Sequence, residues 1–284
     1  MGKFSKFYRV LVLGLLAPMY FSSSLFAAET LRIMPLGDSV TYGGQLPPNV
    51  LTPDTSLAYR GLLWSKLKEN GYDVDFVGSQ QAGSSYLTVD DSFDTDGEGH
   101  NGFRADEIAA NVKKYLEDNP ADIVLLHIGT NDFDQGDTSI TETVLDVENI
   151  LSTIDTVNQD IKVIVAKIIN KQIYDHNITD YNSEIEIMVK NRISHGDDLI
   201  LVDMETGAEL DYTTDMVDDL HPNPQGYAKI ADVWYGAISQ TNSASDKAED
   251  VTSDSVDAWS PLGMIILLML TWLATVSYAR TESI

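Results

Sequence analysis

The chain has 284 residues, no cysteine and a formal net charge of −26 at pH 7. This acidity argues against nucleic acid or a strongly anionic polymer as a partner, because like charges repel. The lack of cysteine excludes disulfides, a thiol nucleophile and thiolate metal ligands.

Residues 1–28 have the pattern of a secretory signal peptide. Three basic residues precede a mostly apolar run over 10–26, and Ala27–Ala28 offers the small side chains that a signal peptidase requires. A retained membrane anchor is the alternative, but Pro18 and the serines at 22–24 interrupt the apolar run. Removal of this segment would bring the charge of the mature chain to −29, so the sequence predicts an exported acidic protein.

Short apolar runs alternate with amphipathic segments between residues 29 and 240, which we interpret as one domain. The apolar runs predict buried strands at 31–35, 74–77, 123–128, 163–168 and 199–202. Helical spacing or composition occurs at 59–69, 105–117, 140–157, 181–192 and 225–238. Near-continuous apolar strands are typical of a parallel sheet that is covered on both faces. The alternation therefore predicts an α/β fold: a three-layer α/β/α sandwich with a five-stranded parallel sheet and right-handed crossovers.

The C-terminal part of the sequence contains a polar segment followed by an apolar one. Residues 241–257 are polar and contain no aromatic side chain, which predicts a linker between domain and tail. Residues 258–280 carry no charge before Arg280 and are long enough to cross a bilayer as one helix, leaving 281–284 as a short tail. A buried core helix is one alternative. A sorting tail that is clipped after export is another, although the basic cluster of such tails is almost absent.

Four short motifs stand out: three lie beyond the ends of predicted strands, and the one with Gly102 precedes the helix predicted at 105–117. They are Gly37-Asp38-Ser39-Val40, His100-Asn101-Gly102-Phe103, Gly129-Thr130-Asn131-Asp132 and Asp218-Asp219-Leu220-His221-Pro222. Open α/β sheets bind ligands beyond the carboxyl ends of their strands, so these motifs are expected to meet at one edge.

The residue types in these motifs are those of serine ester chemistry. A serine hydroxyl such as that of Ser39 becomes a nucleophile only when a nearby base takes its proton, and His221 is the candidate base. Asp218 could orient the imidazole, with Asp219 and Asp215 as rivals by proximity. Each motif alone also fits a structural role, such as a turn or a helix cap.

Two of the motifs contain candidate donors to an oxyanion. A glycine at 102 lets its backbone N–H approach a substrate oxygen closely, and Asn131 could add its side-chain amide. The backbone N–H of Ser39 would be a third donor. Gly97 and Gly99 compete with Gly102 for this role.

The order and spacing of the four motifs resemble those of the SGNH hydrolases, also called GDSL-type esterases. The resemblance covers residues 31–238, and the runs 97–104 and 220–227 are most similar to carbohydrate esterase family three, the acetyl-xylan-esterase-like branch. It implies a flavodoxin-like strand order. It also implies a catalytic set of Ser39, Asp218 and His221, with oxyanion donors from Ser39, Gly102 and Asn131.

Three acidic residues, Asp94, Asp96 and Glu98, suggest a cation site, but they fail the EF-hand spacing because the twelfth loop position carries no acid. We therefore expect no metal and no cofactor. Tyr59 and Arg60 could line or support the pocket, whereas core packing is favoured for Trp64.

These observations lead us to expect an exported, membrane-tethered serine esterase. The expected substrates are small acyl esters, in particular acetyl esters, on a polysaccharide. The alternatives are a lipase, lysophospholipase or thioesterase with the same residues, and a surface-binding module that has lost activity.

Overall fold

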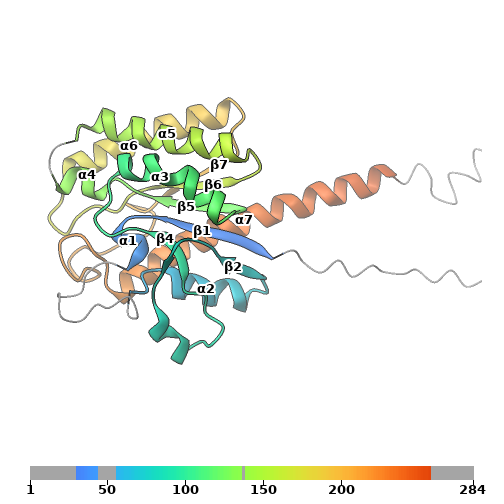
Figure 1. Ribbon diagram of the computed structural model, residues 1–284, viewed down its shortest axis with the longest axis horizontal. Coiled ribbons are helices and arrows are strands. Elements are labelled where there is room, and N and C mark those ends of the chain that lie inside the picture. The colour runs from blue at the N-terminus through green and yellow to red at the C-terminus, as the bar shows by residue number, and fades with distance from the viewer. Residues whose placement is uncertain (1–29, 44–55, 136–137, 257–284) are drawn as a thin grey trace, which may run out of the picture.

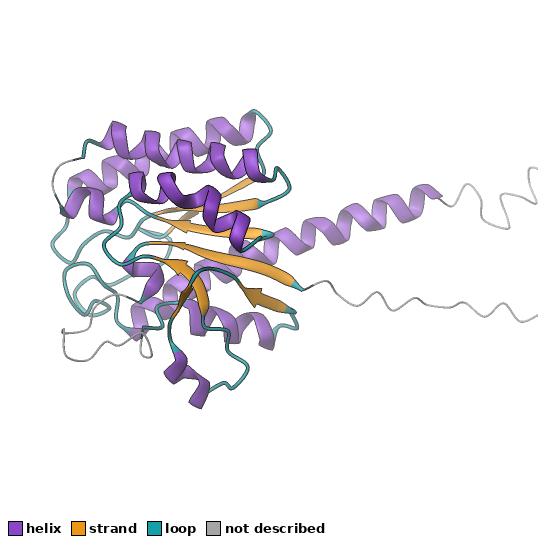
Figure 2. Ribbon diagram, in the orientation of Figure 1, coloured by secondary structure: helices purple, strands orange, loops and turns teal. Residues whose placement is uncertain are grey.

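A twisted sheet with helices on both faces forms the body of the protein (Figures 1 and 2). The computed structural model describes residues 30–43, 56–135 and 138–256. The predicted signal peptide at 1–28 and the predicted membrane or sorting segment at 258–280 lie outside these ranges. In 30–43, 56–135 and 138–256, none of the helices has the length and apolar character that a bilayer crossing requires.

All five predicted strands are present and parallel. They are β1 (Leu31–Gly37), β2 (Val74–Phe76), β5 (Ile123–His127), β6 (Lys162–Lys167) and β7 (Leu199–Asp203). Their order in the sheet is β2-β1-β5-β6-β7, because β1 pairs with β2 on one side and with β5 on the other. This is the flavodoxin-like order that the family resemblance implies.

The expectation of five strands is wrong, since the described sheet has seven. β4 (Asp96–Gly99) pairs in parallel with the last residues of β1, and β3 (Gln80–Gln81) pairs antiparallel with β4. Their sequences, Asp-Gly-Glu-Gly and Gln-Gln, contain no apolar residue, and Gly and Asp are depleted in strands. The carboxyl end of β1 offers free hydrogen-bonding groups to β4, and β4 in turn offers its other edge to β3.

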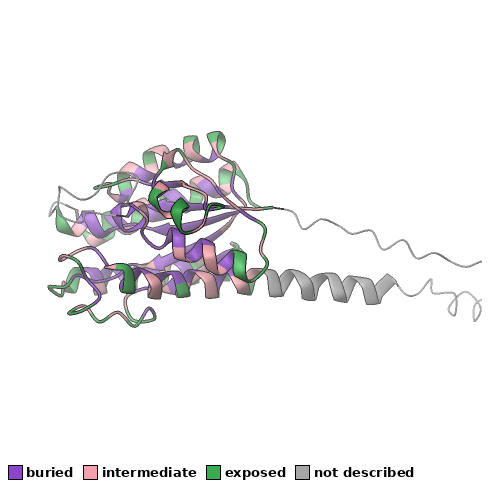
Figure 3. Ribbon diagram, turned by 90° about the horizontal axis from the view of Figure 1, so that it is seen from below, coloured by how far each residue is buried: buried purple, intermediate pink, exposed green. Residues whose placement is uncertain are grey.

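Alternation along the strands divides the core into two halves. On β1, Ile33 faces a cluster with α2 (Arg60–Glu69) and α7 (Pro224–Val256). The next residue, Met34, faces α3 (Ala105–Asp118), α5 (Ile140–Val157) and α6 (His176–Ser194). Figure 3 shows the buried strands between helices whose outer faces are exposed. The predicted three layers are therefore confirmed.

Two helices are longer than predicted. α6 begins at His176 because the Asp175 side chain accepts a hydrogen bond from the Asn177 N–H and caps it. α7 continues to Val256, through most of the segment predicted as a linker. The domain boundary at 240 remains a prediction, but the backbone beyond it is helical and leaves the body on the side where β1 begins (Figure 1).

Candidate active site

Ser39 is held by a tight turn at the end of β1. Gly37 pairs with Gly99 on one side and His127 on the other, and a Cβ at Gly37 would lie 2.2 Å from the His127 carbonyl oxygen. Only glycine fits there. Asp38 then caps the short helix α1 (Ser39–Tyr42) by accepting a hydrogen bond of 2.8 Å from the Val40 N–H. Ser39 thus occupies the first position of a helix at the carboxyl edge of the sheet.

The structure brings Ser39, His221 and Asp218 into one hydrogen-bonded row. Ser39 Oγ lies 2.9 Å from His221 Nε2, and His221 Nδ1 lies 2.9 Å from both carboxylate oxygens of Asp218. The Asp218 carboxylate also accepts the backbone N–H of His221 at 2.8 Å, which fixes the turn. Ser39 and His221 are both buried. This geometry lets the imidazole accept the hydroxyl proton while the carboxylate orients the ring.

The two rival aspartates are engaged elsewhere. Asp219 accepts the Ile173 N–H at 2.6 Å through its carboxylate and ties this segment to the loop before α6. The Asp215 carboxylate accepts the backbone N–H of Asp211 and the ammonium of Lys229, at 2.8 and 2.7 Å. Asp218 is therefore the one of the three that contacts the imidazole.

Gly102 and Asn131 are brought together by a second set of hydrogen bonds. Asn131, in α4 (Thr130–Asp134), donates to the Phe103 carbonyl at 2.8 Å, and Gln135 donates to the Gly102 carbonyl at 3.1 Å. The Asp132 carboxylate accepts the Ala105 N–H at 3.1 Å. These bonds fix the turn at Gly102, whose φ is +79°, against the residues that follow β5.

Of the two competing glycines, Gly99 has a packing role. A Cβ at Gly99 would lie 2.5 Å from the Tyr42 backbone N, so this residue lets β4 pass α1. A Cβ at Gly97 would lie 3.4 Å from the Arg60 guanidinium, an ordinary contact distance. Nothing lies within 4 Å of a Cβ at Gly102, so its surroundings are open on that side.

Burial sets the charge state of the carboxyl next to Ser39. Asp38 is fully buried, and this desolvation raises its pKa to about 7, although the Val40 N–H opposes the shift. The unfolded chain releases this proton near its ordinary pKa of 3.8, whereas the folded chain keeps it. The contribution of Asp38 to stability therefore falls as the pH rises from about 4 to about 7. Burial likewise raises the pKa of Asp132 to about 6 and lowers that of His127 to about 4.

Arg60 stabilises the backbone around the site through hydrogen bonds. Its buried guanidinium donates to five backbone carbonyls, and none of these hydrogen bonds goes to a carboxylate. The carbonyls belong to Tyr42, Ser56, Ala82, Thr95 and Asp96. Burial lowers its pKa to about 10, so it stays charged at neutral pH. Arg60 thus joins the end of α1 to β4. Tyr59 and Trp64 lie in the hydrophobic core, in agreement with the packing role expected for Trp64.

The acidic residues that suggested a cation site bind protein groups. The Asp94 carboxylate accepts the backbone N–H groups of Phe76 and Asp96. Glu98 is fully buried, accepts the Ser79 N–H and hydroxyl at 2.7 Å, and lies 2.6 Å from His100 Nε2. Within the described ranges, no group of three or more His, Asp or Glu side chains could hold a metal ion.

Sequence reasoning did not assign a role to His100. Its ring stacks on Phe103 and Tyr115, with centroids 4.7 and 5.0 Å apart, while its Nε2 pairs with Glu98. These contacts brace the turn that carries Gly102. The Glu-Gly-His spacing is visible in the sequence, but the aromatic neighbours are brought together only by the fold.

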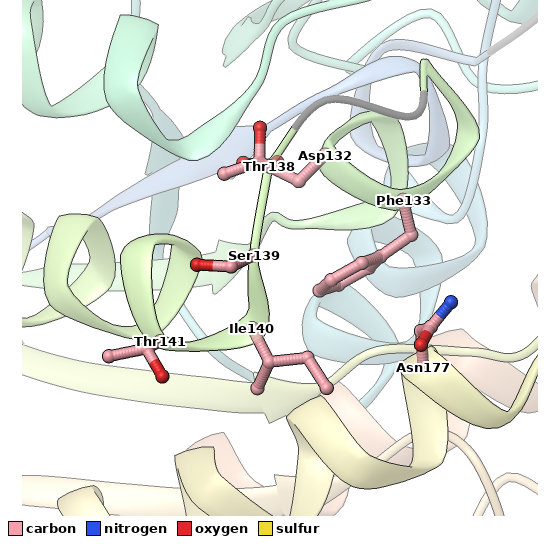
Figure 4. A pocket seen from close by; sticks show the side chains of 7 residues that line it. All are labelled: Asp132, Phe133, Thr138, Ser139, Ile140, Thr141 and Asn177. Atoms are coloured by element: carbon pink, nitrogen blue, oxygen red, sulfur yellow. The ribbon is translucent and has the colours of Figure 1, made fainter.

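A polar pocket lies between α4, the start of α5 and the start of α6 (Figure 4). Asp132 and Phe133 line it from α4, residues 138–141 from the start of α5, and Asn177 from α6. Its volume is about 270 Å³, and its lining does not include Ser39, Asp218 or His221.

The sequence model of the GDSL-like Lipase/Acylhydrolase family matches residues 36–229, a range that contains all four motifs. The chain belongs to this family. A family 3 carbohydrate esterase from Clostridium thermocellum is 31% identical, with a TM-score of 0.61 over 73% of this chain and 94% of that one. A carbohydrate esterase family 3 protein from Talaromyces cellulolyticus is 27% identical, with a TM-score of 0.63 over 75% and 98% of the two chains.

A related sequence is the multidomain esterase of Ruminococcus flavefaciens, which is 28% identical over 251 residues, 78% of this chain. The chain spans 30% of the length of that esterase. The similarity to carbohydrate esterases of family three that the sequence motifs suggest is therefore confirmed.

Proposed function

We propose that this protein is a serine esterase that removes small acyl groups, in particular acetyl, from polysaccharides. The row of hydrogen bonds from Ser39 through His221 to Asp218 is the observation that carries this proposal. The likeness to family 3 carbohydrate esterases supports a carbohydrate ester as the substrate. The strongly acidic chain suits a neutral or acetylated sugar polymer better than an anionic one.

The first half of the reaction transfers the acyl group to the enzyme. His221 Nε2 takes the proton of Ser39 Oγ as the oxygen attacks the ester carbonyl carbon, which gives a tetrahedral oxyanion. The N–H groups of Ser39 and Gly102 and the amide of Asn131 donate to that oxyanion. The bond between the acyl carbon and the sugar oxygen then breaks, and His221 gives its proton to that oxygen, which leaves as the sugar hydroxyl.

The second half releases the acid. His221 takes a proton from water as the water oxygen attacks the acyl-Ser39 carbonyl, and a second tetrahedral oxyanion forms. The bond to Ser39 Oγ breaks, His221 protonates that oxygen, and the carboxylic acid leaves. Asp218 holds the imidazole in the required orientation and stabilises its protonated form throughout.

The chain-length preference tests the substrate class. With nitrophenyl esters of two, four, eight and twelve carbons, kcat/KM should be highest for acetate and fall at least about tenfold by octanoate, a difference of about 1.4 kcal/mol. Acetylated xylan should release acetate under the same conditions. A preference for octanoate or laurate would instead favour a lipase or thioesterase, and inactivity on every ester would favour a binding module.

We also propose that the protein is exported and tethered to a membrane through 258–280, a segment that lies outside the described residues. The described chain begins at Thr30 and α7 ends on the side of the sheet opposite to Ser39, so a tether there would leave the site open (Figure 1).

Fractionation of a bacterial host tests this topology. The full chain should be recovered in the membrane fraction without residues 1–28, whereas a chain ending at 257 should be recovered outside the cytoplasm in soluble form. A full chain that remains cytoplasmic and retains Met1 would contradict the proposal.

A further inference from the structure

The loop between β6 and α6 is attached to the segment that carries His221. The Gln172 N–H donates to the Asp219 carbonyl at 2.8 Å, and the Ile173 N–H donates to the Asp219 carboxylate at 2.6 Å. Asp219 is two residues from His221 and one from Asp218. Ile173 and Tyr174 therefore lie beside the candidate catalytic segment, although they are about fifty residues away along the chain.

This loop exposes large apolar side chains. The exposed fraction is 75% for Ile173 and 55% for Tyr174, and Val217, just before Asp218, is 37% exposed. Across 30–43, 56–135 and 138–256, Tyr174 is the one aromatic residue among the exposed large hydrophobic side chains. Exposed apolar groups that gather at one place commonly mark a binding surface.

The Tyr174 ring is held in place although it is exposed. Its hydroxyl hydrogen-bonds to that of Thr179 at 2.7 Å, and Thr179 donates to Glu205 at 2.5 Å. The ring of His176 packs edge-on against it, with centroids 5.0 Å apart. Because the ring is already fixed, a ligand that packs on it loses little side-chain entropy.

We propose that Tyr174, with Ile173 beside it, is a sugar subsite that binds a pyranose ring of the polysaccharide next to the one whose ester is cleaved. The C–H face of a pyranose is apolar and packs on an aromatic ring, while its hydroxyls stay in water. An acyl chain would instead need a concave apolar pocket, whereas this ring lies half exposed on a loop. The inference rests on the proposed carbohydrate esterase function.

Kinetics with two substrates distinguish a sugar subsite at Tyr174 from a purely structural role of this residue. For Tyr174→Ala, KM for an acetylated xylo-oligosaccharide should rise about tenfold with kcat nearly unchanged, and kcat/KM for nitrophenyl acetate should stay within about twofold of wild type. Tyr174→Phe keeps the ring but loses its hydrogen bond to Thr179, so its KM should lie between those of wild type and Tyr174→Ala. Ile187→Ala, an exposed position on α6 away from this loop, is the matched control and should change neither substrate.

If Tyr174→Ala loses kcat/KM equally for both substrates, the subsite is overturned, because such a result would show distortion of the catalytic segment. An unchanged KM for the oligosaccharide would also overturn it. If the wild-type enzyme releases no acetate from the oligosaccharide, the proposed function fails, and the subsite fails with it. Wild-type activity on the oligosaccharide together with an unaffected Tyr174→Ala variant would reject the subsite alone.

Discussion

Replacing Ser39 with alanine should lower kcat for ester hydrolysis by about 10⁴- to 10⁶-fold, because no other group in the row can form the acyl-enzyme. His221→Ala should cause a similar loss, since the serine hydroxyl then has no base. The double variant should be little worse than either single one, because the two residues act as a unit. The measurement is the initial rate with nitrophenyl acetate.

Two exposed residues on and after α6 provide matched controls for these variants. Ser183→Ala and His195→Ala remove the same side chains far from the row, and both should retain wild-type rates. Thermal unfolding of all four variants would show that the lost activity is not lost folding. A Ser39→Ala variant that keeps more than about a tenth of wild-type activity would remove Ser39 as the nucleophile.

In the same assay, loss of an oxyanion donor should lower kcat less than loss of the nucleophile or the base. Asn131→Ala should lower kcat by about 10²- to 10³-fold, the usual loss for one donor. Part of that loss will come from the Phe103 carbonyl, which loses its hydrogen bond from Asn131. A loss of less than about threefold would assign Asn131 to a structural role.

Replacing Arg60 with methionine should lower the free energy of unfolding by about 3 to 5 kcal/mol, because several buried carbonyls lose their donor at once and each such loss costs about 1 to 3 kcal/mol. Methionine fills much of the same volume, but the carbonyls that Arg60 satisfies would be left without their donor. Arg60→Lys keeps a charge but has fewer donors in a different geometry, so its loss should be intermediate. Urea unfolding measures both.

Arg32→Met is the control for the Arg60 variant. The Arg32 side chain is 42% exposed and pairs with Asp122 at the surface, so its loss should cost about 1 kcal/mol or less. If Arg60→Met and Arg32→Met lose the same stability, Arg60 does not hold the end of α1 to β4 in the way its contacts indicate.

The regular part of the fold could be read from the sequence because apolar strands and amphipathic helices carry local signals. The runs at β5 and β6 have continuous branched side chains, and α5 was predicted with the bounds that the structure shows. β4 could not be predicted in this way. Its Asp-Gly-Glu-Gly sequence has no strand signal and becomes a strand because β1 offers it a partner.

The helical backbone over 241–256 could not be predicted for a related reason, and the linker at 241–257 stays a prediction. Composition indicates that 241–257 has little apolar surface to bury, but it does not prevent a helix that already exists from continuing through the segment. Once α7 is nucleated against the sheet, each added residue gains a backbone hydrogen bond without a new nucleation cost.

The sequence by itself determined the residue types and order of the candidate site. The row of Ser39, His221 and Asp218 joins positions 182 residues apart. The residues alone left Asp215 and Asp219 as rivals of the Asp218 that the family resemblance implies, and the tertiary structure shows that Asp218 meets the imidazole. Contacts at such separations depend on where parallel strands end, which local sequence cannot encode. The same holds for the exposed Tyr174, since the N–H groups of Gln172 and Ile173 just before it donate to Asp219 and bring this loop to the segment that contains His221.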